Sequence, residues 1–115
     1  VPLRLDQVQD GFRGANPRFT EPNFSRNIAR IDGFREFCSA RGWSVPATAL
    51  AWVMSRGDHV IPIPGTRRAE RLREWLPLPS LSAEDLVAIE AVLPAGFAAG
   101  DRYGDHQLQS IERYC

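Results

Sequence analysis

The chain has 115 residues, 43% of them hydrophobic and 24% charged, which is typical of a folded globular domain. Its 14 basic residues balance its 14 acidic residues, and this net charge of zero argues against broad electrostatic binding to nucleic acid or to an anionic membrane. Every basic residue is an arginine, so the chain alone cannot perform chemistry that needs a catalytic lysine.

The ends of the chain and its cysteines indicate a cytoplasmic protein of one domain, residues 1–115. No apolar run reaches the ~20 residues that a membrane span needs, and the start lacks the features of a signal peptide. Cys38 lies in a helical pattern and is expected to be buried, whereas Cys115 is expected to be a free terminal thiol. Because the chain begins with Val1, it is interpreted as a processed product, a fragment or the tail of a longer reading frame.

Residues 1–22 have no sustained periodicity and contain several turn-forming residues, so we expect an irregular loop with one short helical turn near Leu5–Val8. Over residues 23–41, apolar side chains recur every three or four positions, which predicts a helix that Gly42 terminates. The expected buried face of this helix comprises Phe24, Ile28, Ile31, Phe34 and Cys38.

Three further helices are expected in the second half of the chain. One follows the cap residue Ser44 and ends near Arg56, and another opens at Thr66 and runs to about Leu76. The last follows Ser82, where Asp85 completes a capping pattern. After Pro94, residues 95–115 form an irregular tail.

Between the second and third helices, residues 60–64 are too few for a helix and predict one buried strand. A single strand cannot form a sheet, because its main-chain donors and acceptors would lack partners. Either this strand assignment is wrong or the neighbouring strands lie outside the chain. The order helix–helix–strand–helix–helix over residues 23–94 is typical of a piece of a parallel α/β structure.

The start of the third helix is the candidate binding site. Arg67, Arg68 and Arg71 are expected in its first turns, where the helix dipole disfavours positive charge, so an anion is expected opposite them. Ligands of parallel α/β folds bind beyond the carboxyl ends of strands. Gly65 would let a phosphate approach the main chain and Thr66 would supply a hydroxyl, while the guanidinium groups pair with phosphate oxygens.

Glu74, one turn beyond Arg71, could pair with that arginine or accept a hydrogen bond from an exocyclic amine. The spacing supports equally a second interpretation, in which the arginines form a solvated helix face balanced by Glu70 and Glu74. A metal site is not expected, because His59 and His106 each lack further ligands nearby.

Three stretches of the chain resemble, in order, the C-terminal portion of the aldo-keto reductases: NPRFTEPNFSRN, SVPATALAWVMSRGDHVIPIPGTRRAERLREW and LSAEDLVAIEAVLPAGFAAGDRY. The resemblance implies an α/β fold class: a C-terminal fragment of a (β/α)8 TIM barrel that is mostly helical, with one clear strand. It also implies NADP as the cofactor and a small carbonyl compound as the substrate. Residues 1–22 and the tail after Pro94 would correspond to loops at the mouth of the active site.

In this family, the turn after the last strand binds the 2′-phosphate and adenosine of NADP. Carried over by position, the resemblance implies that this chain binds the cofactor through Gly65, Thr66, Arg67, Arg68, Arg71 and Glu74. The position after Glu74 is usually an asparagine that reaches the adenine amine. Here it is Trp75, whose indole has one donor and no acceptor.

The family's catalytic Asp, Tyr, Lys and His all precede this portion, so no catalytic residue is expected in the chain; it has no lysine, and its tyrosines, Tyr103 and Tyr114, lie in the tail. The resemblance therefore implies a truncated, inactive enzyme. A partial barrel would be unstable alone or would self-associate through its open edge. The alternative is a non-catalytic fragment or a partner-dependent binding module from a split or decayed gene.

Overall fold

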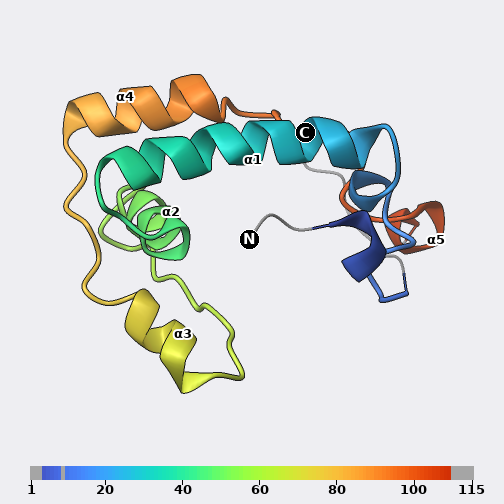
Figure 1. Cartoon of the computed structure of the whole chain (residues 1–115), viewed down its shortest axis with the longest axis horizontal. Coiled ribbons are helices and arrows are strands. Elements are labelled where there is room, and N and C mark those ends of the chain that lie inside the picture. The colour runs from blue at the N-terminus through green and yellow to red at the C-terminus, as the bar shows by residue number, and fades with distance from the viewer. Residues whose placement is uncertain (1–3, 9, 110–115) are drawn as a thin grey trace. The chain divides into compact units, whose positions relative to one another are not determined.

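The computed structural model describes residues 4–8 and 10–109, and within them every regular element is a helix (Figure 1). Tyr114 and Cys115 lie outside the described residues. The chain divides into two compact units, one of Val1–Asp32 with Ala95–Cys115 and one of Gly33–Pro94. The elements in order are η1 (Leu5–Gln7), η2 (Pro17–Phe19), α1 (Asn23–Ala40), α2 (Val45–Met54), α3 (Ala69–Glu74), α4 (Ala83–Val92) and α5 (Asp105–Leu108).

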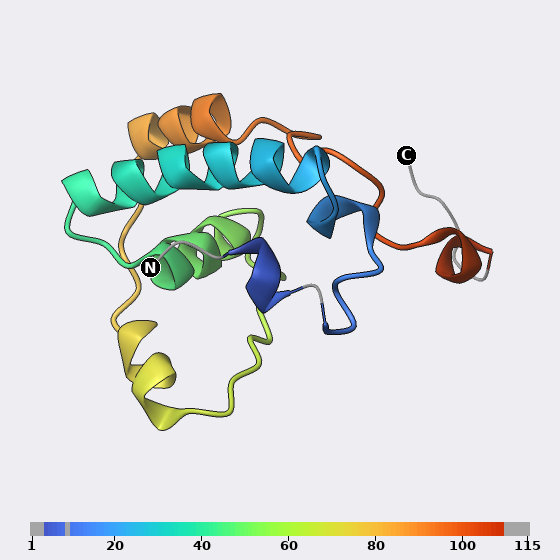
Figure 2. The ribbon, with the colours of Figure 1, turned by 45° about the vertical axis from the view of Figure 1, so that its right-hand side comes forward.

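The core of the unit Gly33–Pro94 lies between the second half of α1 and α4. Phe34, Cys38 and Ile89 are buried there, and partly buried residues that include Trp43 and Trp52 pack around them. The two helices lie side by side in both ribbon views (Figures 1 and 2). Cys38 is 1% exposed, so its predicted buried position is confirmed, and this burial raises the pKa of its thiol.

Serine caps fix where two of these helices begin. The Ser44 side chain accepts a hydrogen bond from the Ala47 main-chain N–H, and α2 starts at the next residue, Val45. Ser82 does the same for α4: its Oγ accepts from the Asp85 N–H, while the Asp85 carboxylate accepts from the Ser82 N–H. Both starts agree with the sequence prediction.

Arg41 ties the end of α1 to the start of α4. Its Nε lies 2.8 Å from Asp85 Oδ1, and its guanidinium lies 3.8 Å from the centroid of the Phe37 ring. The hydrogen bond from the Ser82 main chain, followed by that from Arg41, lowers the pKa of Asp85. One carboxylate therefore serves both the helix cap and the contact between two helices.

The other unit is held by hydrogen bonds between its two chain segments. The Asn27 side chain accepts from the Ala99 N–H at 2.7 Å and donates to the Ala99 carbonyl at 3.0 Å. Arg18 Nε donates to the Gly100 carbonyl at 3.1 Å. The tail after Pro94 was predicted to be irregular, but it contains the short helix α5. Polar side chains of η2 and of the first half of α1 hold the tail in place. The predicted turn near Leu5 is present as η1.

The predicted buried strand over residues 60–64 is wrong for the described chain, because no strand is present there and the segment is largely exposed. Ile61 is 81% exposed and Ile63 is 93% exposed. The main-chain N–H of Val60 is bonded only within its own turn, to the Gly57 carbonyl at 2.9 Å. The physical reason is the one that the sequence raised: without neighbouring strands, an extended segment has no ladder to join. None of the described helices has the length and apolar character required to cross a membrane.

The shared role of Asp85 predicts a pH-dependent stability. A carboxyl group with a lowered pKa stabilises the fold above its unfolded pKa of about 3.9 and loses that effect as the pH falls through the lower folded value. Asp85→Asn should therefore lower the thermal midpoint at pH 7, and the difference from wild type should shrink as the pH falls below about 3.9. Circular dichroism melts from pH 7 to pH 2 measure this, with the exposed Asp58→Asn as control; a constant difference across the range would contradict it.

Gly100 has two reasons to be glycine. Its φ is +86°, and a Cβ built on it would lie 2.6 Å from the Asn23 amide nitrogen and 3.0 Å from the Pro17 main chain. Gly96 has a φ of +76° with open space around it. Gly96→Ala should therefore cost only the conformational strain of about 1–2 kcal/mol, whereas Gly100→Ala should cost more because atoms must also move. Chemical denaturation of both variants measures this, and equal losses would show that the close approach is unimportant.

Candidate functional site

The candidate site lies between α2 and α3, where residues 60–65 have no regular secondary structure and lead into a turn. Thr66 closes that turn: its Oγ1 lies 3.2 Å from both the main-chain nitrogen and the main-chain oxygen of Arg68. The hydroxyl that was predicted to face a phosphate is thus engaged with the main chain two residues further on. It shapes the loop just before the helix.

The third helix begins three residues later than predicted. α3 starts at Ala69, and Arg68 is its N-cap residue, with extended main-chain angles and no side-chain capping bond. Threonine is a residue type that commonly caps the start of a helix, but the hydrogen bond between Thr66 and Arg68 forms a turn instead. In this short helix Arg71 and Arg73 occupy the last turn, where the helix dipole favours positive charge. Only Arg67 and Arg68 lie at the N-terminal end of α3, where the helix dipole disfavours positive charge.

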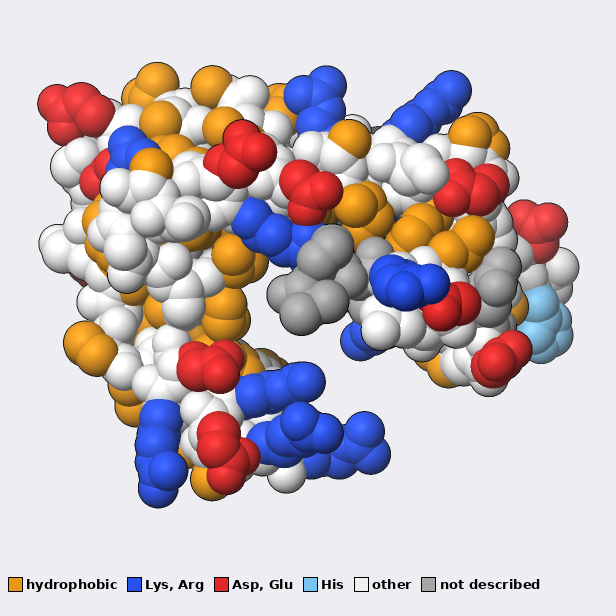
Figure 3. Space-filling view, in the orientation of Figure 1, with side chains coloured by type: hydrophobic (Ala, Val, Ile, Leu, Met, Phe, Trp, Pro, Cys, Tyr) orange, Lys and Arg blue, Asp and Glu red, His pale blue; other side chains and the backbone are white. Residues whose placement is uncertain are grey.

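The arginines of this segment are exposed and have no carboxylate partner among the described residues. Figure 3 shows blue side chains gathered over α3, and the cluster comprises Arg67, Arg68, Arg71 and Arg73. Arginines elsewhere do form ion pairs, as Arg41 does with Asp85 at 2.8 Å and Arg56 with Glu90 at 3.0 Å. Glu70 and Glu74 lie on the same helix and are exposed, but neither forms an ion pair with these arginines.

Gly65 is not required by the described fold. It is not among the glycines with positive φ, and a Cβ built on it would meet no atom within 4 Å. A side chain at this position would instead occupy the space beside the turn that Thr66 closes. The open main chain at Gly65 and the unpaired guanidinium groups that follow it fit an anion such as a phosphate.

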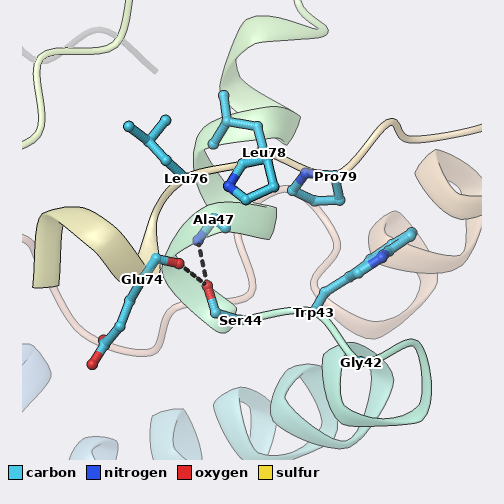
Figure 4. A pocket seen from close by; sticks show the side chains of 9 residues that line it. Gly42, Trp43, Ser44, Ala47, Glu74, Leu76, Leu78 and Pro79 are labelled. Atoms are coloured by element: carbon cyan, nitrogen blue, oxygen red, sulfur yellow. Dashed lines mark hydrogen bonds between the residues drawn. The ribbon is translucent and has the colours of Figure 1, made fainter. Parts of the chain in front are cut away.

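Glu74 belongs to a hollow that the sequence did not reveal. Ser44 Oγ donates a hydrogen bond to the Glu74 carbonyl at 2.8 Å, which ties the end of α3 to the start of α2 (Figure 4). A hollow of about 380 Å³ lies beside this bond, and its lining includes Trp43, Leu76 and Pro79. In Figure 4 the Glu74 carboxylate points away from the Trp43 indole. Glu74, whose carboxylate was predicted to lie near adenine, is exposed.

The described residues contain no group of three or more His, Cys, Asp and Glu side chains placed to hold a metal ion. His59 is exposed and lies against Gly57, and His106 lies in α5 beside a second hollow, in the other unit. Tyr103, also in that unit, carries the Arg102 guanidinium 5.4 Å from its ring centroid.

Comparison with known proteins identifies the family of this chain. The model of the Aldo/keto reductase family matches residues 5–94, which include α1 to α4 and the whole candidate site. The chain belongs to the aldo/keto reductase family. Membership of this family implies that the chain is a portion of a (β/α)8 barrel, although its described regular structure is helical.

Curated aldo-keto reductases resemble the chain over most of its length. An aldo-keto reductase of Gibberella moniliformis is 32% identical over 108 residues, covering 92% of this chain and 32% of the relative. The probable aldo-keto reductase 1 of Glycine max is 37% identical over 95 residues, covering 77% of this chain and 26% of the relative. The aldo-keto reductase yakc [NADP(+)] of Schizosaccharomyces pombe is 32% identical over 69 residues, covering 60% of this chain and 20% of the relative.

The chain thus spans about a third or less of the length of the curated aldo-keto reductases that it matches. No solved structure matches it.

The bond between Ser44 and Glu74 predicts that one hydroxyl holds two elements of this aldo-keto reductase segment. Ser44→Ala removes both the cap of α2 and the donor to the Glu74 carbonyl, so it should destabilise the chain by more than the roughly 1 kcal/mol of a cap alone. The control is Ser55→Ala, because Ser55 Oγ bonds only locally, to the Trp52 carbonyl at 2.7 Å. Urea denaturation compares them, and equal losses would rule out a role for the tie to α3.

Proposed function

We propose that this chain retains the turn with which an aldo-keto reductase holds the 2′-phosphate and adenosine end of NADP(H), and that it does not reduce carbonyl compounds alone. The observation that carries the proposal is the cluster of exposed arginines around α3 without carboxylate partners in the described chain. Exposed like charges this close repel one another, and a phosphate dianion would relieve that repulsion.

Each residue of the proposed site has a distinct part. Gly65 leaves the main chain open to the phosphate, and the turn closed by Thr66 sets the direction of the chain at that point. Arg67 and Arg68 supply planar donors that pair with phosphate oxygens two at a time, and Arg71 does so from within the short helix α3. Glu74 would lie toward the adenosine. NADP is favoured over NAD because only NADP carries the additional phosphate that such donors bind.

The chemistry proper would need residues that this chain lacks. The family reaction is a reversible hydride transfer between NADPH and a carbonyl. The bound cofactor supplies the hydride, a tyrosine donates the proton, and a lysine lowers the pKa of that tyrosine. The chain has no lysine, and Tyr103 lies in the unit that does not contain the arginine cluster. The small carbonyl substrate and a cytoplasmic location stay predictions from the sequence.

Titration with 2′-phospho-AMP, followed by tryptophan fluorescence, tests the proposal because Trp75 directly follows the site. We expect saturable binding that is at least about tenfold weaker for AMP, which lacks the second phosphate. Arg67→Ala and Arg71→Ala should each weaken the binding of 2′-phospho-AMP without changing that of AMP.

The matched control is Arg73→Ala, which removes the same charge from the same helix but at a position outside the proposed site. It should leave the binding of 2′-phospho-AMP nearly unchanged. Equal affinity for the two nucleotides, or an equal loss in Arg73→Ala and Arg71→Ala, would mean that the cluster attracts anions without recognising the 2′-phosphate. Circular dichroism of each variant checks that the helices are intact.

A further inference from the structure

The second hollow, beside α5, belongs to the unit of Val1–Asp32 with Ala95–Cys115, whereas the arginine cluster belongs to the other unit. It has a volume of about 430 Å³, and its lining comes from two segments, one within residues 11–16 and one at residues 104–107. A Cβ built on Gly104 would lie 3.6 Å from the Ala15 carbonyl oxygen, so the two segments are in contact where the hollow forms. Small-molecule sites have volumes of this order.

Asn16 lines this hollow and is only 6% exposed. Its main-chain N–H donates to the Arg13 carbonyl at 3.0 Å, and its carbonyl accepts from the Phe19 N–H at 2.9 Å. Asn16 is the N-cap residue of η2, where an asparagine side chain commonly accepts a main-chain hydrogen bond, yet it forms no such bond. Across residues 4–8 and 10–109, the side-chain amide of Asn16 has no partner. The amide atoms are not fully enclosed by protein, and the opening that they meet is the hollow.

The other two asparagines of the chain use their side chains to hold the fold. Asn23 donates to the Pro17 carbonyl at 3.1 Å, and Asn27 bonds to both main-chain groups of Ala99. A buried amide without a partner is unfavourable, because it has lost hydrogen bonds to bulk water and has gained none in the protein. A ligand in the hollow that bonds to Asn16 would remove this unfavourable state.

The remaining lining favours an uncharged ligand with a flat apolar part. Phe12 is 74% exposed, which leaves an aromatic ring without cover beside the hollow. Asp105 adds a carboxylate that would repel an anion, and within the described residues no arginine lines the hollow to attract one. His106, its neighbour in α5, is the other ionisable residue of the lining. A neutral ring therefore suits this hollow better than a phosphate or a carboxylate does.

The chemistry of an amide selects the group that pairs with it. The Asn16 side chain holds N–H donors and a carbonyl acceptor side by side. A second amide offers the same two groups in the opposite order, so the two amides can form two hydrogen bonds at once. A ketone only accepts, and a carboxylate only accepts and is also repelled by Asp105.

We propose that the second hollow binds uncharged planar compounds whose ring carries an amide, and that Asn16 recognises this amide through a pair of hydrogen bonds. The amide is either a primary carboxamide on the ring or a lactam within it, since both place a donor beside an acceptor. Asn16 is a binding residue here and takes part in no reaction step. The proposal goes beyond nucleotide binding and does not depend on it, because the lining and the arginine cluster belong to different units.

NMR titration of the isotope-labelled 115-residue chain tests the proposal through the side-chain NH₂ signal of Asn16. Benzamide represents the primary carboxamide and 2-pyridone the lactam. Acetophenone keeps the ring and the carbonyl of benzamide but has no N–H donor, and benzoate replaces the amide with an anion. We expect benzamide, 2-pyridone or both to shift the Asn16 signal saturably and to bind at least about tenfold more tightly than acetophenone or benzoate.

Asn16→Leu replaces the amide with an apolar side chain of similar size. It should weaken the binding of the amide probe by at least about tenfold and change the binding of acetophenone by no more than about twofold. The matched control is Gln7→Leu, which removes an exposed side-chain amide from the same unit and should leave the binding of every probe unchanged.

Thermal melts show whether the Asn16 amide serves the fold instead. Because the Asn16 side chain has no partner to lose within the described chain, Asn16→Leu should melt at or above the wild-type midpoint. Asn23→Leu loses the bond to the Pro17 carbonyl and should melt below it.

Several results would overturn the proposal: binding of neither amide, equal binding of the amides and acetophenone, equal amide binding by Asn16→Leu and wild type, or a midpoint of Asn16→Leu below that of wild type. The affinity for 2′-phospho-AMP should be the same in Asn16→Leu and in wild type. The site in the second hollow and the nucleotide site can therefore each fail while the other holds.

Discussion

The need of every main-chain N–H and C=O for a partner governs this structure. A helix satisfies most of its own groups, whereas a strand depends on residues far away in the sequence. The described chain accordingly retains α1, α2 and α4 around Phe34, Cys38 and Ile89, and residues 61–65 lie between α2 and α3 without a main-chain hydrogen bond. The regular structure that the described chain forms is therefore helical, because helices form from hydrogen bonds between residues close in the sequence.

The same distinction explains which elements could be read from the sequence. The starts of α2 and α4 were predictable because Ser44 and Ser82 bond to N–H groups three residues away, which is a local event. Thr66 misled the prediction because a threonine before a helix can equally bond two residues ahead, and here it does so. The single turn of α5 has only Gly104 before it, without a side-chain cap to mark its start.

The residue types of the candidate site could be predicted from the sequence, but their arrangement in space could not. Arginine identity and spacing indicated an anion partner, and the structure places those arginines on the surface without carboxylates to neutralise them in the described chain. The tie between Ser44 and Glu74 joins residues 30 positions apart, and no local pattern encodes such a contact. The hollow beside Trp43 is lined by both of these residues, so it could not be foreseen either.

The reactivity of Cys38 depends on how often the packing around it opens. Its thiol is buried among Phe34, Ile89 and their neighbours, and this burial raises its pKa, which disfavours the thiolate that attacks electrophiles. An alkylating reagent can reach it only when the packing between α1 and α4 opens. The rate of its alkylation therefore reports how often the unit Gly33–Pro94 opens, separately from the helix content that spectroscopy averages over the whole chain.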